Sequence, residues 1–468
     1  MINRLIRFNS FRTRFIKILT VFILFLFVNS IYSKNTKQQY ETLRLIRQEK
    51  FDHILPGAMR DAEVDMWIHS VQGGIRDPLA LDLGGQISFG VEDTLGYYIF
   101  TDRGGDRIER AILGGYGDES IYDYFGSEKE LYQFVKNRDP KVIAVNMSLA
   151  LPIANGLSHT AYLRMTEALG KKYSKRIVSA ASIITNFRVR RVQKEIIVFA
   201  NICEIQRQIM ESALRSISPG KTTRGEIGWW ANDKLAMKGF PPSFEAESLF
   251  LPYMPRIAHS DISENINKDN IDYLFQPGDF LSWDMGVGYL NFGTDFKRAA
   301  YILKDNENNA PAGLRRAWSK GLNVREIIRK TFTTGYDAGK SLINIVDALE
   351  KEGYVYTPSM DRGTQYRDLM NKLEDSDKIG FTIDMHATGN TSIGDVTSGP
   401  SVAPWRFGRS HIKVEQNYIF ALEFEINAWI PEWGKRLSIP FEENAIVTSK
   451  GVEYIYPPHE KIILISGR

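Results

Sequence analysis

Short apolar runs alternate with helical repeats in the first part of the chain. The runs 63–68, 96–101 and 142–147 are apolar and partly aromatic, as strands are, and the stretch 127–135 between them is helix-like. A short helix over 40–49 is predicted to precede them. Because strands that alternate with helices are typical of an α/β layer structure, we predict an N-terminal α/β domain.

The clearest helical repeat in the sequence begins near Lys194. Its apolar residues recur at spacings of three, four and four, which places them on one helix face: Ile202, Ile205, Ile209 and Ala213. A Ser-Pro-Gly sequence at 218–220 ends it. The basic run 188–191 directly before the helix is the predicted domain boundary, with one domain over 34–190 and the next over 191–468.

The N-terminus has the layout of a leader. Residues 1–30 contain five basic residues and no acid, and an apolar run occupies 18–28. This is typical of a secretory signal peptide, and the run is well short of the roughly 20 residues that span a bilayer as a stable helix. We therefore predict a signal peptide at 1–33 and an exported protein, periplasmic or secreted, with no stable membrane span after cleavage. An uncleaved anchor is the alternative.

Charge and cysteine content exclude several function classes. The formal net charge is +3, and removing the five unopposed cations of the leader leaves −2 for the rest. Without a basic stripe, nucleic acid is not expected as a partner. Cys203 is the single cysteine, so an internal disulfide and cysteine-rich zinc modules are excluded. Its position in the middle of a helix predicts a buried structural thiol.

Two aspartates lie in apolar surroundings in the second half of the chain. Asp284 lies inside the strand-like run 280–286, and the run 289–292 leads to Asp295. A hairpin hinged near 286–288 is expected to bring the two carboxylates side by side. Burial of two adjacent ionised carboxylates costs several kcal/mol, and a cation between them removes the conflict. The pair is therefore a candidate metal site.

Three more ligand-type residues follow in similar settings. Glu423 lies in an alternating run of large apolar residues, Glu442 lies just before another strand-like run, and His386 follows a strand end. One imidazole with four carboxylates forms an oxygen-rich site, which suits two divalent ions such as Mn²⁺, Co²⁺ or Zn²⁺.

The order of these five residues resembles that of the M24-type metallopeptidases with the pita-bread fold. That superfamily includes methionine aminopeptidase, aminopeptidase P, prolidase and creatinase. Four segments carry the resemblance: PGD…DxG at 277–286, TDxxR at 294–298, HxxGN at 386–390 and E-x5-T at 442–448. The first domain is similar to that of the aminopeptidase P and Xaa-Pro dipeptidase branch. The resemblance implies an α+β protein, with an N-terminal creatinase-type α/β domain before a pita-bread catalytic domain.

The same resemblance implies a role for each ligand. Asp284 is expected to chelate one metal ion, Asp295 and Glu442 to bridge two ions, and His386 and Glu423 to hold the other. Two such ions polarise a scissile carbonyl and lower the pKa of a bridging water. Manganese is the expected metal, with cobalt and zinc as alternatives.

Two residues are implied to be catalytic. Glu423 is expected to accept the proton of the attacking water, and His259 falls where the family keeps a histidine that stabilises the tetrahedral intermediate. The expected activity is release of the N-terminal residue from short peptides, with Xaa-Pro bonds as candidates. A homodimer is implied by resemblance alone.

One departure and several alternatives accompany this prediction. The family has a second histidine shortly before a Gly-Pro pair, whereas this chain has Asp395 ahead of Gly399-Pro400. A neutral imidazole can donate a hydrogen bond, but an ionised carboxylate can only accept one. The alternatives are a weakened or inactive binding module, a creatinase-like amidinohydrolase that needs no metal, and a structural calcium site.

Overall fold

The structure is a computed structural model of the whole chain. It describes 36–468 except 76, 88–93, 119, 150, 241–253, 262–269, 359–367, 370–372, 374–376, 391–398 and 467–468. The predicted signal peptide and Asp395 therefore lie outside the described residues. Across the residues that are described, no helix is both long and apolar enough to cross a bilayer.

The chain divides into two compact units, 1–49 and 50–468. In the first unit, the described residues 36–49 are helical, which confirms the helix predicted over 40–49. All elements below belong to the second unit.

A six-stranded sheet forms the centre of the N-terminal α/β region. Its strand order is β6-β4-β3-β1-β7-β8, with antiparallel pairing of β1 with β3 and of β3 with β4, and parallel pairing elsewhere. Trp67 of β1 packs in one apolar core, whereas its neighbours Met66 and Ile68 pack in another. This alternation shows that both faces of the sheet are covered, as the predicted α/β layer structure requires. The strands are β1 (Met66–Gln72), β3 (Leu95–Thr101), β4 (Glu109–Leu113), β6 (Tyr124–Gly126), β7 (Ile143–Val145) and β8 (Ile177–Ser179), beside a two-stranded sheet of β2 (Gly85–Ile87) and β5 (Gly115–Gly117).

Local signals explain most of the boundaries in this region. The first strand begins at Met66 and not at the expected residue 63, because Glu63 has a left-handed φ of 54° that ends the preceding helical segment. The helix expected over 127–135 begins with a capping box between Ser127 and Glu130. The helices are α2 (Leu55–Asp61), α3 (Ala80–Leu83), α4 (Leu131–Arg138), α5 (His159–Ser174) and α6 (Ala181–Val189), with 3-10 turns η1 (Glu128–Glu130) and η2 (Pro152–Ala154).

The predicted long helix is α7 (Gln193–Arg215), which follows α6 after three residues. Three of the four apolar residues of its predicted face are buried, and Ile205 is half-buried. Cys203 is buried, as predicted. A second helix, α8 (Arg224–Ala236), begins at Thr223 with a capping box to Glu226.

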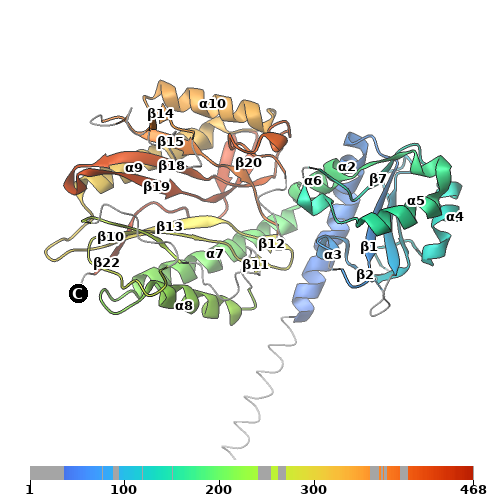
Figure 1. Cartoon of the computed structure of the whole chain (residues 1–468), viewed down its shortest axis with the longest axis horizontal. Coiled ribbons are helices and arrows are strands. Elements are labelled where there is room, and N and C mark those ends of the chain that lie inside the picture. Colours follow the sequence, from blue (N-terminus) through green and yellow to red (C-terminus); the bar gives the residue numbers. More distant parts are fainter. Residues whose placement is uncertain are drawn as a thin grey trace, which may run out of the picture. The chain divides into compact units, whose positions relative to one another are not determined.

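Three four-stranded sheets follow α8. The first has the order β22-β13-β10-β9, the second β14-β15-β18-β19 and the third β16-β17-β20-β21. Figure 1 shows α7 and α8 beside the first sheet, and α9 and α10 beside the second. Their bounds are β9 (Arg256–His259), β10 (Asp279–Met285), β13 (Phe296–Ile302), α9 (Ala312–Thr331), α10 (Ala338–Lys351), β14 (Val355–Tyr356), β15 (Gly380–Ile383), β16 (His386–Ala387), η5 (Phe407–Arg409), β17 (Ile419–Ala421), β18 (Phe424–Ile430), η6 (Pro431–Trp433), β19 (Lys435–Phe441), β20 (Asn444–Thr448), β21 (Gly451–Tyr454) and β22 (Ile463–Ile465).

One large apolar core joins α9 and α10 to the second and third sheets. Within it, Gly321 of α9 lies so close to β19 that a Cβ added there would fall 2.1 Å from the ring of Phe441. The ring of Phe441 stacks on Phe424 of β18, with ring centroids 5.0 Å apart. The close packing of α9 therefore sets the positions of the strand ends next to Glu423 and Glu442.

Candidate metal centre

The first two candidate ligands lie at one end of the β10–β13 pair. Antiparallel pairing places Asp284 opposite Lys297, and Asp295 directly precedes β13. The two aspartates lie in one cluster, as expected, since a carboxylate oxygen of each lies within 4.8 Å of a carboxylate oxygen of Glu442. The expected hinge was wrong. The segment between the strands forms its own ribbon, β11 (Gly288–Tyr289) with β12 (Phe292–Gly293), whose turn contains Leu290 in a left-handed conformation.

The other three ligands meet because the second and third sheets share one register. Phe424 pairs with Phe441 in one sheet, and Ala421 pairs with Asn444 in the other. Continuing this register through the residues between the two pairs places Glu423 opposite Glu442. His386 pairs with Ala421 in the same way. Strand pairing therefore gathers residues that lie far apart in the sequence.

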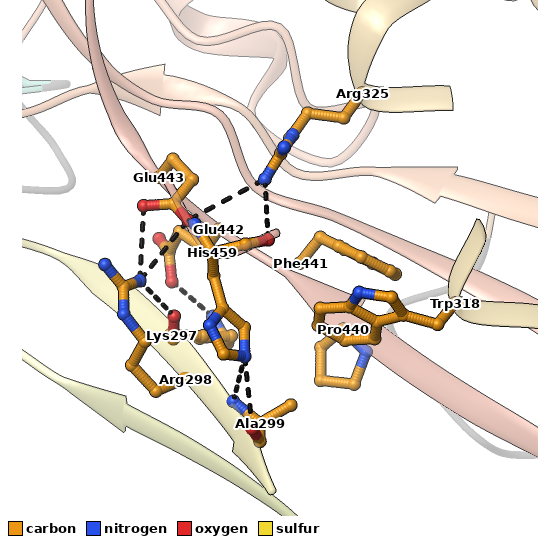
Figure 2. A pocket seen from close by; sticks show the side chains of 10 residues that line it. All are labelled: Lys297, Arg298, Ala299, Trp318, Arg325, Pro440, Phe441, Glu442, Glu443 and His459. Atoms are coloured by element: carbon orange, nitrogen blue, oxygen red, sulfur yellow. Dashed lines mark hydrogen bonds and ion pairs between the residues drawn. The ribbon is translucent and has the colours of Figure 1, made fainter. Parts of the chain in front are cut away.

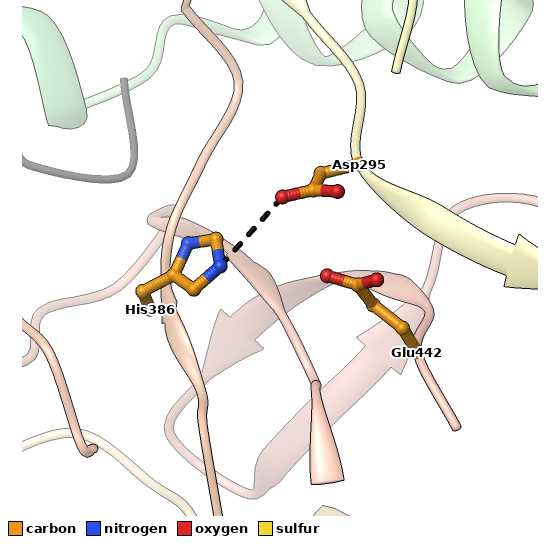
Figure 3. Close-up of side chains that lie close together, drawn as sticks. All are labelled: Asp295, His386 and Glu442. Atoms are coloured by element: carbon orange, nitrogen blue, oxygen red, sulfur yellow. Dashed lines mark ion pairs between the residues drawn. The ribbon is translucent and has the colours of Figure 1, made fainter. Parts of the chain in front are cut away.

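Asp295, His386 and Glu442 form the first triad (Figure 3). All three are buried, and their ligand atoms lie within 4.8 Å of one another. His386 Nε2 is 3.6 Å from Asp295 Oδ2. Burial, with the nearby charge of Arg406, lowers the pKa of His386 to about 3, so the imidazole is neutral. His386 Nδ1 lies 3.2 Å from the carbonyl oxygen of Ala387 and is placed to donate to it. Nε2 is then unprotonated, and its lone pair faces the carboxylates.

The donors of the first triad fit a divalent ion. Burial, together with neighbouring carboxylates, raises the pKa of Asp295 and of Glu442 well above the ordinary range. Among the described residues, the buried Oε1 of Glu442 has no hydrogen-bond partner. The Nε2 lone pair of His386 and the carboxylate oxygens of Asp295 and Glu442 converge on one point. The negative charges and the lone pair repel one another unless a cation lies between them. Imidazole with carboxylates is a donor set that Mn²⁺, Co²⁺ and Zn²⁺ accept.

Asp284, Glu423 and Glu442 form the second triad, whose ligand atoms also lie within 4.8 Å of one another. Here, however, the chain supplies its own cation. Lys297 Nζ lies 3.0 Å from Asp284 Oδ2, 2.7 Å from Glu423 Oε1 and 2.5 Å from Glu442 Oε2. Burial by itself lowers the pKa of Lys297, but the three carboxylates together raise it well above its ordinary value. The ammonium of Lys297 therefore lies among the three carboxylates that the sequence analysis assigned to the metal centre, and it neutralises part of their charge.

The sequence contained a signal for Lys297 that the prediction missed. Alternate residues of a strand share a face, so Lys297 lies on the same face as Asp295, two residues earlier. The prediction also missed Asp384 as a neighbour of the cluster. The same rule could have indicated it, because Asp384 lies two residues before His386. Asp384 forms an ion pair with Arg406, and its backbone N–H donates to the carbonyl oxygen of Glu423.

Supporting residues hold the ligands in place. The side chain of Asn444 accepts from the backbone N–H of Asp295 at 3.0 Å and donates to its carbonyl oxygen at 2.6 Å. The buried Arg191 donates to the carbonyl oxygen of Thr388 at 3.0 Å and to Asn390 Oδ1 at 2.9 Å. Gly389 between them has a φ of +104°, and a side chain there would meet Arg191. This contact explains the glycine of the HxxGN segment.

A second ionic network lies on the other face of β13 (Figure 2). Arg298 Nη1 is 3.2 Å from Glu443 Oε2, and Arg325 Nη1 donates to the carbonyl oxygen of His459 at 3.0 Å. Burial lowers the pKa of His459 to about 3, and this ring packs at the edge of Trp318. The network is a structural support behind Glu442.

The structure does not bring His259 to this cluster. His259 pairs with Asp279 at the start of β10, whereas Asp284 lies five residues further along the strand. At about 3.3 Å per residue, the distance along the strand from the partner of His259 to Asp284 is roughly 16 Å. Burial lowers the pKa of His259, and its Nδ1 accepts from the backbone N–H of Asp261 at 3.0 Å. The position lends no support to the catalytic role predicted for this histidine.

Comparisons with known proteins agree with the predicted family and fold. The family model "Metallopeptidase family M24" matches residues 198–449, more than half of the chain. No curated protein sequence matches.

Several solved structures are similar over most of the chain. The X-Pro aminopeptidase from Thermotoga maritima has a TM-score of 0.56 and 14% identity, and the match covers 87% of this chain and 100% of that one. The Xaa-Pro dipeptidase from Bacillus anthracis has a TM-score of 0.55 and 16% identity, with 90% and 100% covered. The prolidase from Pyrococcus horikoshii has a TM-score of 0.53 and 15% identity, with 89% and 100% covered. These similarities confirm the predicted fold class, an N-terminal domain followed by a pita-bread domain.

Proposed function

The chain belongs to metallopeptidase family M24, and on this premise we propose that it removes the N-terminal residue from short peptides in a metal-dependent reaction. The observation that carries the proposal is the first triad. Its three buried ligands converge within 4.8 Å, and Glu442 Oε1 has no partner among the described residues.

Each residue of the site has a role in this proposal. Asp295, His386 and Glu442 would hold a divalent ion. Such an ion polarises a scissile carbonyl and lowers the pKa of a water. Glu423 is about a quarter exposed, and its Oε2 lies 3.8 Å from His386 Nε2, so it can accept a proton at the open side of the cluster. Asn444 keeps Asp295 in position through its backbone.

Xaa-Pro peptides are the proposed substrates. Two of the similar structures are named for Xaa-Pro or X-Pro activity and a third is a prolidase. At 14–16% identity these similarities support the fold, and the substrate class is carried over as a proposal. Manganese as the metal, export through the leader, and a homodimer belong to the proposal as well.

The test uses the chain from residue 34 onward, after removal of bound metal and addition of Mn²⁺. Release of alanine from Ala-Pro and Ala-Pro-Xaa peptides is expected, and chelation is expected to abolish it. Asp295→Ala should remove the activity, whereas Asp305→Ala, which removes an exposed aspartate after β13, should retain it. A protein that binds Mn²⁺ but releases nothing from either peptide class would refute the proposed substrate and favour the binding-module alternative.

A further inference from the structure

The chain places one of its own cations where a second metal ion would bind. We infer that the ammonium of Lys297 takes the place of that ion, so that this protein holds a single divalent ion, at Asp295, His386 and Glu442. The inference deepens the proposed function and rests on its metal dependence. It assigns Lys297 a positioning role that neither the sequence motifs nor the comparisons assign.

Strand geometry determines where the side chain of Lys297 points. Its Cα lies opposite that of Asp284 in the β10–β13 pair, and residues directly opposite each other project from the same face. Its backbone N–H also donates to the carbonyl oxygen of Glu442 at 3.2 Å. The backbone of Lys297 thus lies opposite one of the three residues that its side chain contacts and is hydrogen-bonded to another. Only 5% of the side chain is exposed.

The contacts of Lys297 involve all three members of the second triad. Its Nζ lies within 3.0 Å of an oxygen of Asp284, of Glu423 and of Glu442. A metal ion held by the same three carboxylates would lie at about 2.0–2.2 Å from its ligand oxygens. The ion and the ammonium would then compete for the same small volume, and two cations so close together repel each other strongly.

The first triad differs in this respect. In the part of the chain that the structure describes, no lysine or arginine forms an ion pair with Asp295; its partner is His386 Nε2, 3.6 Å from Asp295 Oδ2. Glu442 joins the two triads through different oxygens: Oε2 contacts Lys297, while Oε1 has no partner among the described residues. One side of Glu442 is therefore satisfied by the chain, and the other remains available to one ion.

Lys297 also donates to Glu423, the proposed proton acceptor, at 2.7 Å. This hydrogen bond holds one oxygen of Glu423 in place, while the other faces His386. In this arrangement the lysine neutralises and orients the carboxylates that a second ion would otherwise hold. Lys297 does not contact the reacting atoms in this role.

The test is the number of metal ions per chain. Wild type, Lys297→Ser and Lys304→Ser are saturated with Mn²⁺, freed of excess metal, and analysed by elemental analysis and by electron paramagnetic resonance. Lys304 is a matched control, because it forms a lysine–aspartate ion pair at the surface, 2.9 Å from Asp261. We expect one ion per chain and the spectrum of an isolated ion in wild type and control. Lys297→Ser should bind two ions and show an exchange-coupled pair.

Wild type with two ions per chain would overturn the inference, as would a folded Lys297→Ser variant that still binds one. Absence of any ion from wild type would overturn both the inference and the proposed function. The wild-type stoichiometry decides the question even if the variant does not fold. Peptide release by the same samples separates the two proposals: one ion without release refutes only the proposed function, and two ions with release refute only the inference.

Discussion

Removal of the Lys297 ammonium should destabilise the metal-free protein. Lys297→Ala leaves Asp284, Glu423 and Glu442 without the cation that contacts all three at 2.5–3.0 Å. Because Lys297 is only 5% exposed, water cannot replace it fully without local rearrangement. Breaking a buried ion pair by removal of one partner typically costs about 3–5 kcal/mol, and we expect a loss of that size in the free energy of unfolding.

The matched comparison is Lys304→Ala. Its ion pair with Asp261 is at the surface, with the two side chains 36% and 69% exposed, and such pairs contribute about 0–1 kcal/mol. The difference between the two variants therefore measures the effect of burial among carboxylates. Loss of a lysine charge by itself is common to both.

The assay is urea unfolding in the presence of EDTA, followed by tryptophan fluorescence and far-ultraviolet circular dichroism. Coincident transitions are required before a single free energy is extracted. Added Mn²⁺ should restore much of the stability of Lys297→Ala, because an ion that binds only the folded state adds about 2.7 kcal/mol at one hundred times its dissociation constant. A loss below about 1 kcal/mol in EDTA, equal to that of the control, would refute the argument that Lys297 neutralises this cluster.

Three further outcomes are expected. Gly321→Ala should lower the free energy of unfolding by about 1–3 kcal/mol in chemical denaturation, because the new Cβ would meet the ring of Phe441 at 2.1 Å. Burial raises the pKa of Asp279 from 3.8 to about 7, so its contribution to stability is full below pH 4 and is lost as the pH rises through 7. Asp279→Asn should therefore flatten the decline between pH 4 and 8 and be more stable than wild type at pH 8 by roughly 2–4 kcal/mol; a variant with an unchanged pH profile would contradict this. Arg191→Lys should weaken Mn²⁺ affinity by about 10–100-fold in a titration followed by calorimetry, because the two hydrogen bonds to the loop after His386 come from separate nitrogens of a planar guanidinium, a fork that an ammonium does not reproduce.

Local patterns in the sequence were sufficient for several elements. The apolar face of α7 follows from spacings of three and four residues, which need only the geometry of one helix. The proximity of Asp284 and Asp295 follows from two strands joined by a short connection. The exact position of the turn did not follow, because Leu290 adopts a left-handed conformation that is uncommon for leucine and that its presence in a sequence does not predict.

The ligand set could be predicted only because its order resembles that of a known family. Nothing local to Glu423 or Glu442 indicates that His386 lies beside them. Their proximity arises from the register of four strands, with Phe424 opposite Phe441 and His386 opposite Ala421. Backbone pairing between distant segments decides such contacts, and a sequence pattern does not contain the register.

The sequence by itself therefore determined the kinds of side chains available: the carboxylates and the imidazole of a metal centre, on elements whose periodicity could be recognised. The tertiary structure alone decided how they are combined. It placed His259 at the far end of β10 and Lys297 within the second triad, because the register of β9, β10 and β13 sets the distance of each side chain from Asp284. The charge balance of the centre depends on these distances, and for that reason only the folded chain shows that one of its cations is a lysine.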